Sequence, residues 1–226
     1  MDGGDPLRDR LAAASPLFDL TLRTERLVLR LPTDSELLDL MDLAMAGIHP
    51  PDEMPFGVAW SVMPSPAFER SYLAYHWDNR ASWTPESWEL GLGVSLDGRL
   101  IGMQGMHARA FAATRTVNTG SWLGRDFQGQ GYGKEMRAAV LALAFDGLGA
   151  LAAETEAFLD NHGSAGVSRA LGYRENGLGS LSPQGVPRPT QRFRMTDEDW
   201  RSRPRPSTVI EGLAACLERF GVSDPG

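Results

Sequence analysis

Residues 120–145 read GSWLGRDFQGQGYGKEMRAAVLALAF, so the end of a predicted strand passes through a glycine-dense turn directly into an amphipathic helix. Glycines at 129, 131 and 133 permit tight backbone curvature, and they let several amide N–H groups point at one anion beside the positive end of the helix. The pattern predicts a loop that binds a pyrophosphate.

Two other glycine motifs are excluded at this loop. A dinucleotide-binding GxGxxG pattern needs glycine at position 134, where Lys134 stands. A phosphate-binding P-loop needs serine or threonine at position 135, where Glu135 stands. A carboxylate in the first helical turn complements the helix dipole, so we interpret Glu135 as structural rather than catalytic.

The flanking segments alternate between strand and helix patterns. Apolar residues at intervals of three and four predict helices, and alternating runs bounded by turn residues such as Asp97-Gly98 predict strands. The helices are predicted at 34–46, where Thr33 and Glu36 have the spacing of a capping box, and at 66–82, 132–148 and 162–171. The strands are predicted as two short segments within 18–32 and at 88–96, 99–107, 116–124, 151–158, after Gly172, and at 191–195.

Residues 48–66 combine five prolines with the bulky side chains of Met54, Phe56, Trp60 and Met63. This composition predicts a packed loop rather than a linker. Two interpretations stay open: a lid over a substrate, in which His49, Asp52 and Glu53 receive a cationic group, or a cover for the sheet.

The composition bounds the class of protein. A chain of 226 residues with 42% hydrophobic and 23% charged residues has the profile of one large globular domain. A net charge of −7 disfavours nucleic acid as a partner. One cysteine, Cys216, forms no internal disulfide, and no apolar run has the length of a membrane span or a signal peptide. We expect a cytoplasmic protein without membrane contact.

Three segments are predicted along the chain. Residues 1–17 read as a flexible N-terminal segment with one or two helical turns, residues 18–196 as the domain, and residues 197–226 as a C-terminal extension. The amphipathic stretch Val209–Phe220 predicts that this extension packs on the domain or on a partner subunit, which leaves a homo-oligomer open.

The glycine loop resembles a known motif once its flanks are included. Gln128-x-x-Gly131-x-Gly133 is similar to the Q/R-x-x-G-x-G/A coenzyme A signature of the GNAT N-acyltransferase superfamily. Residues 160–164 (DNHGS) and the Leu171-Gly172-Tyr173 block resemble the family's downstream strand, helix and Leu-Gly-aromatic segment. The opening TERLVLRLPT at 24–33 is similar to the RimJ/RimL-type branch. The segments MPF at 54–56, GSWLG, GYGKEMRAAVL and 197–200 resemble a mycobacterial GNAT succinyltransferase.

This resemblance implies a mixed α/β fold, in which a twisted, mainly antiparallel sheet is flanked by helices and two splayed strands hold coenzyme A. It implies an N-acyltransferase that moves an acetyl or succinyl group from acetyl-CoA or succinyl-CoA to a primary amine by direct attack. A backbone amide near Leu123 would polarise the thioester carbonyl. The resemblance implies no metal. The acceptor is a small molecule or a protein amine. The cofactor-binding residues that it implies are Trp122, Leu123, Gly124, Gln128, Gly129, Gln130, Gly131, Tyr132, Gly133, Lys134, Asn161 and Ser164.

The sequence departs from the family at two catalytic positions. Asn118 stands where many members have a glutamate that acts as the general base. Ser168 stands where many have a tyrosine that protonates the departing thiolate. Ser168 remains a candidate acid, and the candidate bases are Glu89, His107, Glu154 and Glu156. These departures support an alternative of another class, a non-catalytic module that binds or senses acyl-CoA.

Simpler structural roles compete with several of these assignments. Asn161 is a good helix N-cap, and Arg109 and Arg115 are either solvated or available to a succinyl carboxylate. The four histidines lack the spacing of metal ligands, so we predict no metal site.

Overall fold

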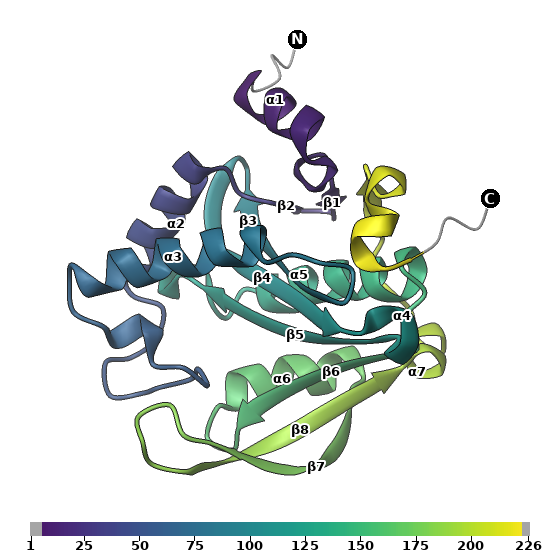
Figure 1. Ribbon diagram of the computed structural model, residues 1–226. Coiled ribbons are helices and arrows are strands. Elements are labelled where there is room, and N and C mark those ends of the chain that lie inside the picture. The colour runs from purple at the N-terminus through teal and green to yellow at the C-terminus, as the bar shows by residue number, and fades with distance from the viewer. Residues whose placement is uncertain (1–5, 223–226) are drawn as a thin grey trace.

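Nine strands form one sheet with helices on both faces in the computed structural model, which describes residues 6–222 (Figure 1). The strand order is β7-β8-β6-β5-β4-β3-β2-β1-β9, and every neighbouring pair is antiparallel except β5 and β6. The mixed α/β fold predicted from the sequence is confirmed. The strands are β1 (Thr21–Arg23), β2 (Leu27–Arg30), β3 (Ser87–Leu96), β4 (Arg99–Arg109), β5 (Thr116–Leu123), β6 (Ala152–Phe158), β7 (Arg174–Leu181), β8 (Arg188–Thr196) and β9 (Val209–Glu211).

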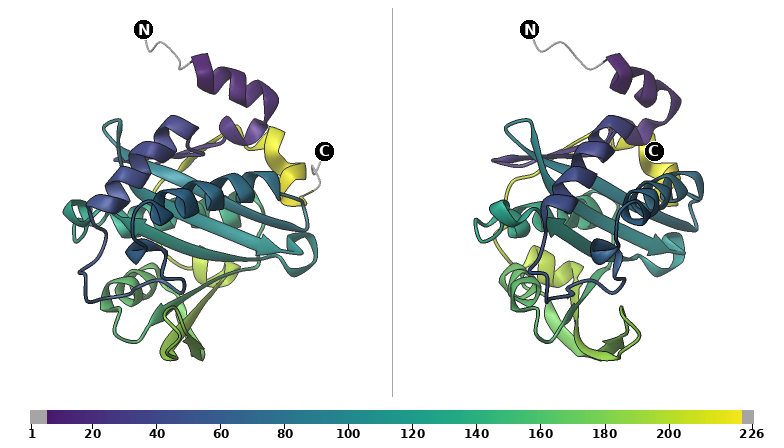
Figure 2. Two further views of the ribbon diagram at one scale, coloured as in Figure 1. Left: turned by 60° about the vertical axis from the view of Figure 1, so that its left-hand side comes forward. Right: turned by 90° about the vertical axis from the view of Figure 1, so that its left-hand side faces the viewer.

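The helices form two layers. Figure 2 shows α2 and α3 together in front of the sheet, and α5 covers the opposite face with α6 packed beside it. The helices are α1 (Pro6–Ala14), α2 (Asp34–Ala46), α3 (Ala67–Ala81), α4 (Phe111–Thr114), α5 (Tyr132–Ala142), α6 (His162–Leu171) and α7 (Asp197–Arg201). The predicted capping box is present at α2, where Thr33 Oγ1 accepts from the Glu36 amide and the Glu36 carboxylate accepts from the Thr33 amide.

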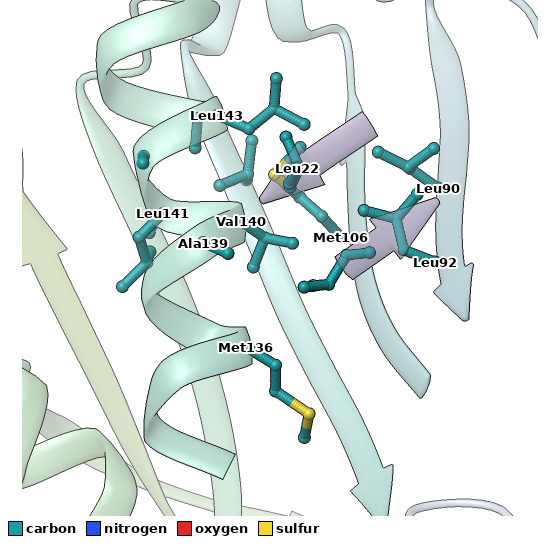
Figure 3. Close-up of a cluster of buried hydrophobic side chains, with 14 of the residues drawn as sticks. Leu22, Leu90, Leu92, Met106, Met136, Ala139, Val140, Leu141 and Leu143 are labelled. Atoms are coloured by element: carbon teal, nitrogen blue, oxygen red, sulfur yellow. The ribbon is translucent and has the colours of Figure 1, made fainter. Parts of the chain in front are cut away.

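The larger core lies between the sheet and α5. Leu90 and Leu92 of β3 and Met106 of β4 face Met136 and Val140 of α5 (Figure 3). The smaller core lies under α2 and α3, where Leu37, Leu40, Phe68, Tyr72 and Met103 are buried together. The alternation of strand side chains between these two cores fixes which residues line each face.

The helix predicted over 132–148 changes its winding near its end. α5 stops at Ala142, and residues Leu143–Gly147 form a π-helical turn that closes with the Leu148 amide donating to Leu143 O at 2.8 Å. A Cβ at Gly147 would lie 2.8 Å from Leu213 Cδ2, so a larger residue here would displace the Leu213 side chain of the C-terminal segment. The sequence prediction of one uniform helix is wrong over these five residues, which wind as a π-helical turn where Gly147 lies close to Leu213 and Ile210.

The ends of the described chain both pack on the domain. Within the predicted flexible segment, residues 6–14 form α1, whose Arg8 donates to Phe18 O and Leu31 O and pairs with Glu36 at 2.7 Å; residues 1–5 lie outside the described part. The predicted amphipathic stretch 209–220 splits into β9, which pairs with β1, and a 3-10 helix over Ala214–Phe220. Residues 223–226 lie outside the described part.

Candidate active site

The glycine loop joins β5 to α5 through left-handed backbone positions. Gly129 and Gly131 have φ of +73° and +87°, and Gly131 is the N-cap residue of α5. Side chains are strained at such angles, which explains glycine at both positions. The first amides of α5 have no acceptor within the helix, so they are available to an anion beside the positive helix end.

Side chains hold this loop in place from two directions. Gln128 Nε2 donates to Leu123 O at the end of β5 and to Ile48 O after α2, both at 2.8 Å. Glu135 accepts from Thr24 Oγ1 at 2.6 Å and from Arg26 Nε at 2.7 Å. These bonds, together with the Arg26 charge, keep the pKa of the Glu135 carboxyl low despite partial burial. Glu135 therefore has the structural role predicted for it.

The side chains predicted to hold the cofactor differ in accessibility. Tyr132 is buried beneath the Arg26 guanidinium, which lies 4.4 Å from its ring centroid, so only its backbone can face a ligand at the loop. Gln130 Nε2 donates to Asp126 O, and Lys134 is exposed in the first turn of α5. Leu123 and Gly124 are buried at the end of β5.

β5 and β6 part soon after they meet. Their parallel pairing spans Thr116↔Ala152, Val117↔Ala153 and Asn118↔Glu154, and the described residues show no further β5–β6 pair. Thr119 to Leu123 and Thr155 to Phe158 therefore present backbone edges toward a gap between them. We call the Asn118↔Glu154 end of this gap the apex. The apex and the glycine loop lie at opposite ends of β5, which is a layout suited to an extended ligand with an anionic end.

Trp122 links this gap to the loop over residues 48–66. Its ring centroid lies 6.1 Å from that of Trp60, which also packs against Phe68 and Tyr72. Arg188 of β8 donates to Met54 O at 2.6 Å, so the loop also reaches the β7–β8 hairpin. The loop is packed, as predicted, whereas the choice between lid and cover stays open. His49 is bonded to Ser61 Oγ and Pro50 O.

A buried polar cluster lies on the α5 side of the gap, and sequence reasoning missed it. Arg137 of α5 donates to Ser121 Oγ of β5 at 3.1 Å and to Thr155 Oγ1 of β6 at 3.4 Å. Its Nε has no hydrogen-bond partner within the described structure. Burial lowers the pKa of the guanidinium and raises that of the Tyr173 phenol beside it. The one sequence signal was an arginine on the apolar face of a predicted helix. The polar cluster comprises Gln104, Thr119, Ser121, Arg137, Thr155 and Tyr173.

Helix α6 carries three more of the predicted residues. Asn161 caps the helix by accepting from the Ser164 amide at 3.0 Å. Ser168 is fully buried, and its hydroxyl donates to Ser164 O at 3.1 Å within the same helix. The contacts of Asn161 and Ser164 with a cofactor, and the role of Ser168 as an acid, stay predictions.

A row of polar side chains crosses the opposite face of the sheet at the apex. Its members are joined pairwise by strand register: Glu89↔His107, His107↔Asn118, Asn118↔Glu154 and Glu154↔Arg194. They line a cavity of about 680 Å³, whose rim includes Asn79 of α3 and Arg109. Three of the four candidate bases, Glu89, His107 and Glu154, are thus brought together beside the apex.

The electrostatics of this polar row differ along its length. Tyr75 of α3 donates a short hydrogen bond to Glu89. Desolvation lowers the pKa of the neighbouring His107 imidazole, against a smaller opposing effect of Glu89. Glu154 is paired with Arg194. The imidazole is therefore neutral near pH 7 and can accept a proton.

Two other predicted residues are engaged elsewhere. Glu156 accepts from Thr190 Oγ1 and lies near Arg192, outside the cavity lining. Arg115 donates to Leu148 O at 3.0 Å, whereas Arg109 lines the cavity.

A strip of three glycines, which we call the bare floor, extends from the polar row along the gap. Gly91, Gly105 and Gly120 face one another across β3, β4 and β5, two residues from Glu89, His107 and Asn118 respectively. A Cβ at Gly120 would meet no atom within 4 Å, and one at Gly105 would meet only Gly120 O, at 3.4 Å. The sheet surface beside the cavity is therefore open at Gly105 and Gly120, whereas a Cβ at Gly91 would lie 3.3 Å from Met103 Cε.

Across residues 6–222 no group of three or more His, Cys, Asp and Glu side chains is arranged to hold a metal ion. No described helix combines the length and apolarity needed to cross a membrane.

Comparison with known proteins shows which family the sequence matches and which folds are similar. Residues 26–174 match the family model described as an acetyltransferase (GNAT) domain. The fold is similar to that of Mycobacterium smegmatis RimJ in complex with CoA-disulfide, at 19% identity over 88% of this chain and 93% of that one, with a TM-score of 0.63. A GNAT-family acetyltransferase from Bacillus anthracis has 15% identity over 79% and 99%, with a TM-score of 0.64. The ribosomal L7/L12 acetyltransferase RimL in complex with coenzyme A has 14% identity over 76% and 95%, with a TM-score of 0.59.

Proposed function

Because the chain belongs to the GNAT acetyltransferase family, we propose that it is an N-acyltransferase that moves an acyl group from acyl-CoA to a primary amine. One observation carries the proposal: the apex of the gap between β5 and β6 is also part of the wall of the 680 Å³ cavity, through Asn118 and Glu154. A thioester held between the strands would therefore meet an amine held in the cavity.

The chain fits a coenzyme A donor on three grounds. The left-handed glycines and the first amides of α5 suit the diphosphate. The free backbone edges of β5 and β6 suit the amides of the pantetheine arm, as does the buried and unpartnered Gln104 Oε1. Asn161 and Ser164 at the start of α6 are further proposed contacts.

The cavity supplies the groups that an amine acceptor needs. Glu89 and Glu154 favour a cationic amine, and the neutral His107 beside Glu89 can accept the proton that the amine must lose. We assign the proton route to Glu89 and His107. The amine nitrogen then attacks the thioester carbon directly, with the carbonyl oxygen polarised by a backbone amide near Leu123.

The acyl group is acetyl in the simplest form of this proposal. Succinyl is the alternative, and Arg109 at the rim of the cavity is the guanidinium placed to pair with its carboxylate. Arg115 is already bonded to Leu148 O, so Arg109 is the better candidate.

Thermal unfolding with no ligand, CoA, acetyl-CoA and succinyl-CoA tests the donor. At a hundredfold over its Kd a ligand stabilises the fold by about 2.7 kcal/mol, which shifts the midpoint by about 5 to 10 °C for a chain of this size. A larger shift with succinyl-CoA favours that donor. No shift with any of them contradicts the proposal.

A matched pair of glycine variants tests the loop. Gly131→Trp places a large side chain in the loop, and Gly177→Trp imposes similar backbone strain on β7, because their φ values are +87° and +88°. We expect the thermal shift with CoA to vanish in Gly131→Trp and to persist in Gly177→Trp. Normal CoA binding by Gly131→Trp would overturn the loop assignment.

A binding or sensing module is the second candidate function. It is favoured by Asn118 in place of an acidic base and by Ser168, whose hydroxyl is used within α6. Release of free thiol from acetyl-CoA or succinyl-CoA in the presence of a panel of primary amines separates the two functions. A module would bind acyl-CoA without releasing thiol, whereas an enzyme would release it.

A further inference from the structure

Arg137 is a buried cation without an anionic partner. Its side chain comes from the sheet-facing side of α5 and leaves the residue only 3% exposed. Within residues 6–222 no carboxylate lies within ion-pair distance, and its acceptors are the hydroxyls of Ser121 and Thr155, with Tyr173 beside them. A buried charge held only by neutral groups is costly to fold, so an anion that enters its surroundings would be strongly favoured.

The other members of the polar cluster do not supply that anion. Arginine stays protonated in proteins, and the raised pKa of the buried Tyr173 keeps its phenol neutral. Tyr173 is the other titratable group of the polar cluster, where its hydroxyl is shared with Thr119 Oγ1 at 3.3 Å. On the far side of the sheet, Glu154 is already paired with Arg194.

The position of Arg137 in the gap indicates which anion would lie beside its guanidinium. Its guanidinium joins Thr155, one residue beyond the apex on β6, to Ser121, three residues beyond it on β5. A donor that enters from the glycine loop brings its sulfur along the gap before its acyl carbon reaches the cavity. In the proposed function the acyl carbon would face the amine on the α3 side, which would leave the sulfur toward Arg137 on the α5 side.

We propose that Arg137 stabilises the negative charge that develops on the coenzyme A sulfur as the thioester is cleaved. This inference rests on the proposed function. As the amine nitrogen bonds to the acyl carbon, the carbon–sulfur bond breaks, its electron pair stays on sulfur, and the amine proton leaves through the cavity. The product is a thiolate paired with the guanidinium, so the chain needs no proton donor at position 168.

The first experiment titrates the thiol of bound CoA by its ultraviolet thiolate absorption. We expect the thiol pKa in the wild-type complex to lie at least about one unit below that of free CoA, as for a group beside an opposite charge. Arg137→Met should return it to the free value, Arg137→Lys should retain part of the shift, and the exposed control Arg201→Met should retain all of it. An unshifted thiol in the wild-type complex overturns the inference.

The second experiment compares the affinity for CoA with that for desulfo-CoA, which lacks the sulfur. At a pH above the thiol pKa of free CoA, Arg137→Met should lower the affinity for CoA about tenfold and leave the affinity for desulfo-CoA unchanged. An equal loss of affinity for both ligands would indicate a purely structural role of Arg137. A loss of affinity confined to succinyl-CoA would indicate that the partner of Arg137 is a carboxylate. Either result overturns the inference. Failure of the wild type to bind CoA would instead contradict the proposed function.

Discussion

At the residue scale, Glu89 lies between a phenol and an imidazole. Tyr75 donates to its carboxylate from α3, and His107 is its register partner on β4. The Tyr75 hydroxyl fixes one oxygen of the carboxylate, and the carboxylate charge favours the protonated form of the imidazole. In the proposed function, this arrangement serves His107 as the acceptor of the amine proton.

We expect Glu89→Gln to lower kcat/KM for the acceptor amine by about 10² to 10⁴, the range found for loss of general acid–base groups. The amide keeps the shape of the side chain but cannot support a protonated His107. Steady-state thiol release measures the effect. Tyr75→Phe is the matched control, which removes the hydroxyl and keeps the ring, and it should cost less. Wild-type kcat/KM in Glu89→Gln would exclude this carboxylate from the proton route.

A second prediction concerns the bare floor at Gly120. Because a Cβ there would meet no atom within 4 Å, Gly120→Val should fold with unchanged or slightly higher stability in urea, since glycine weakens a strand. The added side chain should obstruct the surface beside the cavity and raise KM for the acceptor at least severalfold. Unchanged KM would indicate that the acceptor approaches elsewhere.

At the element scale, α3 carries a histidine in an unusual electrostatic position. His76 packs edge-on against Tyr72, with ring centroids 4.6 Å apart, and its Nδ1 would lie 4.0 Å from a Cβ at Gly91. Burial, assisted by the Arg80 charge, lowers the pKa of His76 from 6.5 to about 4. The imidazole is therefore neutral near pH 7 at the position where α3 approaches Gly91 of β3.

This shift predicts how stability depends on pH. The unfolded chain binds a proton at His76 near pH 6.5 and the folded chain only near pH 4, so the free energy of unfolding falls as pH decreases through that window. The loss is at most about 3 kcal/mol, reduced by the partial exposure of the side chain. Urea unfolding of the wild type and His76→Phe should show a shallower pH slope in the variant and no difference in slope above pH 7.

Elements with local signals were predictable from the sequence. The capping box at Thr33 and the Asp97-Gly98 turn depend on neighbouring residues, and α2, α3 and α6 lie within a residue of their predicted bounds. β9 was missed because its pairing with β1 joins residues about 190 positions apart. A three-residue strand has too little pattern of its own to be recognised.

The candidate site was only partly predictable for the same reason. The glycine loop is a local motif, whereas the polar row depends on the register of five strands, which nothing near Glu89 or Arg194 encodes. Arg137 was missed because helical periodicity shows that a position is buried without showing which side chains it meets. The sequence therefore predicts the donor end of the site better than the chemistry around the apex.

At the scale of the whole molecule, the C-terminal segment completes the core. Phe220 is fully buried and packs edge-on against Trp83 and Trp88, and Trp83 Nε1 donates to Arg219 O at 2.8 Å. The apolar side of this segment is thus used within the chain.

We expect Phe220→Ala to lower the free energy of unfolding by about 3 to 5 kcal/mol, as for large cavities in cores. Val209→Ala, at a position that is 53% exposed, is the control and should cost less than about 1 kcal/mol. Urea titration followed by tryptophan fluorescence measures both. A small effect of Phe220→Ala would mean that the extension is only loosely attached.

The reactivity of the Cys216 thiol tests the same packing of the C-terminal segment on the core. It is fully buried, and burial raises its pKa to about 11. Because the thiolate is the reactive form, a thiol reagent at pH 8 should modify the folded protein far more slowly than the protein in urea. Fast modification without denaturant would show that this segment opens readily.

The early parting of β5 and β6 gives the sheet an internal edge, with strand amides and carbonyls that face each other without pairing. In most proteins such edges occur at the periphery, where they invite unwanted strand addition. Here α5 packs on β5 and α6 packs on β6, so the edge lies inside the molecule rather than at its periphery. In the proposed function, the pantetheine arm of coenzyme A would bond to both strands and complete the sheet as a strand that can leave again. Slowed hydrogen exchange at residues 119–123 and 155–158 should accompany its binding.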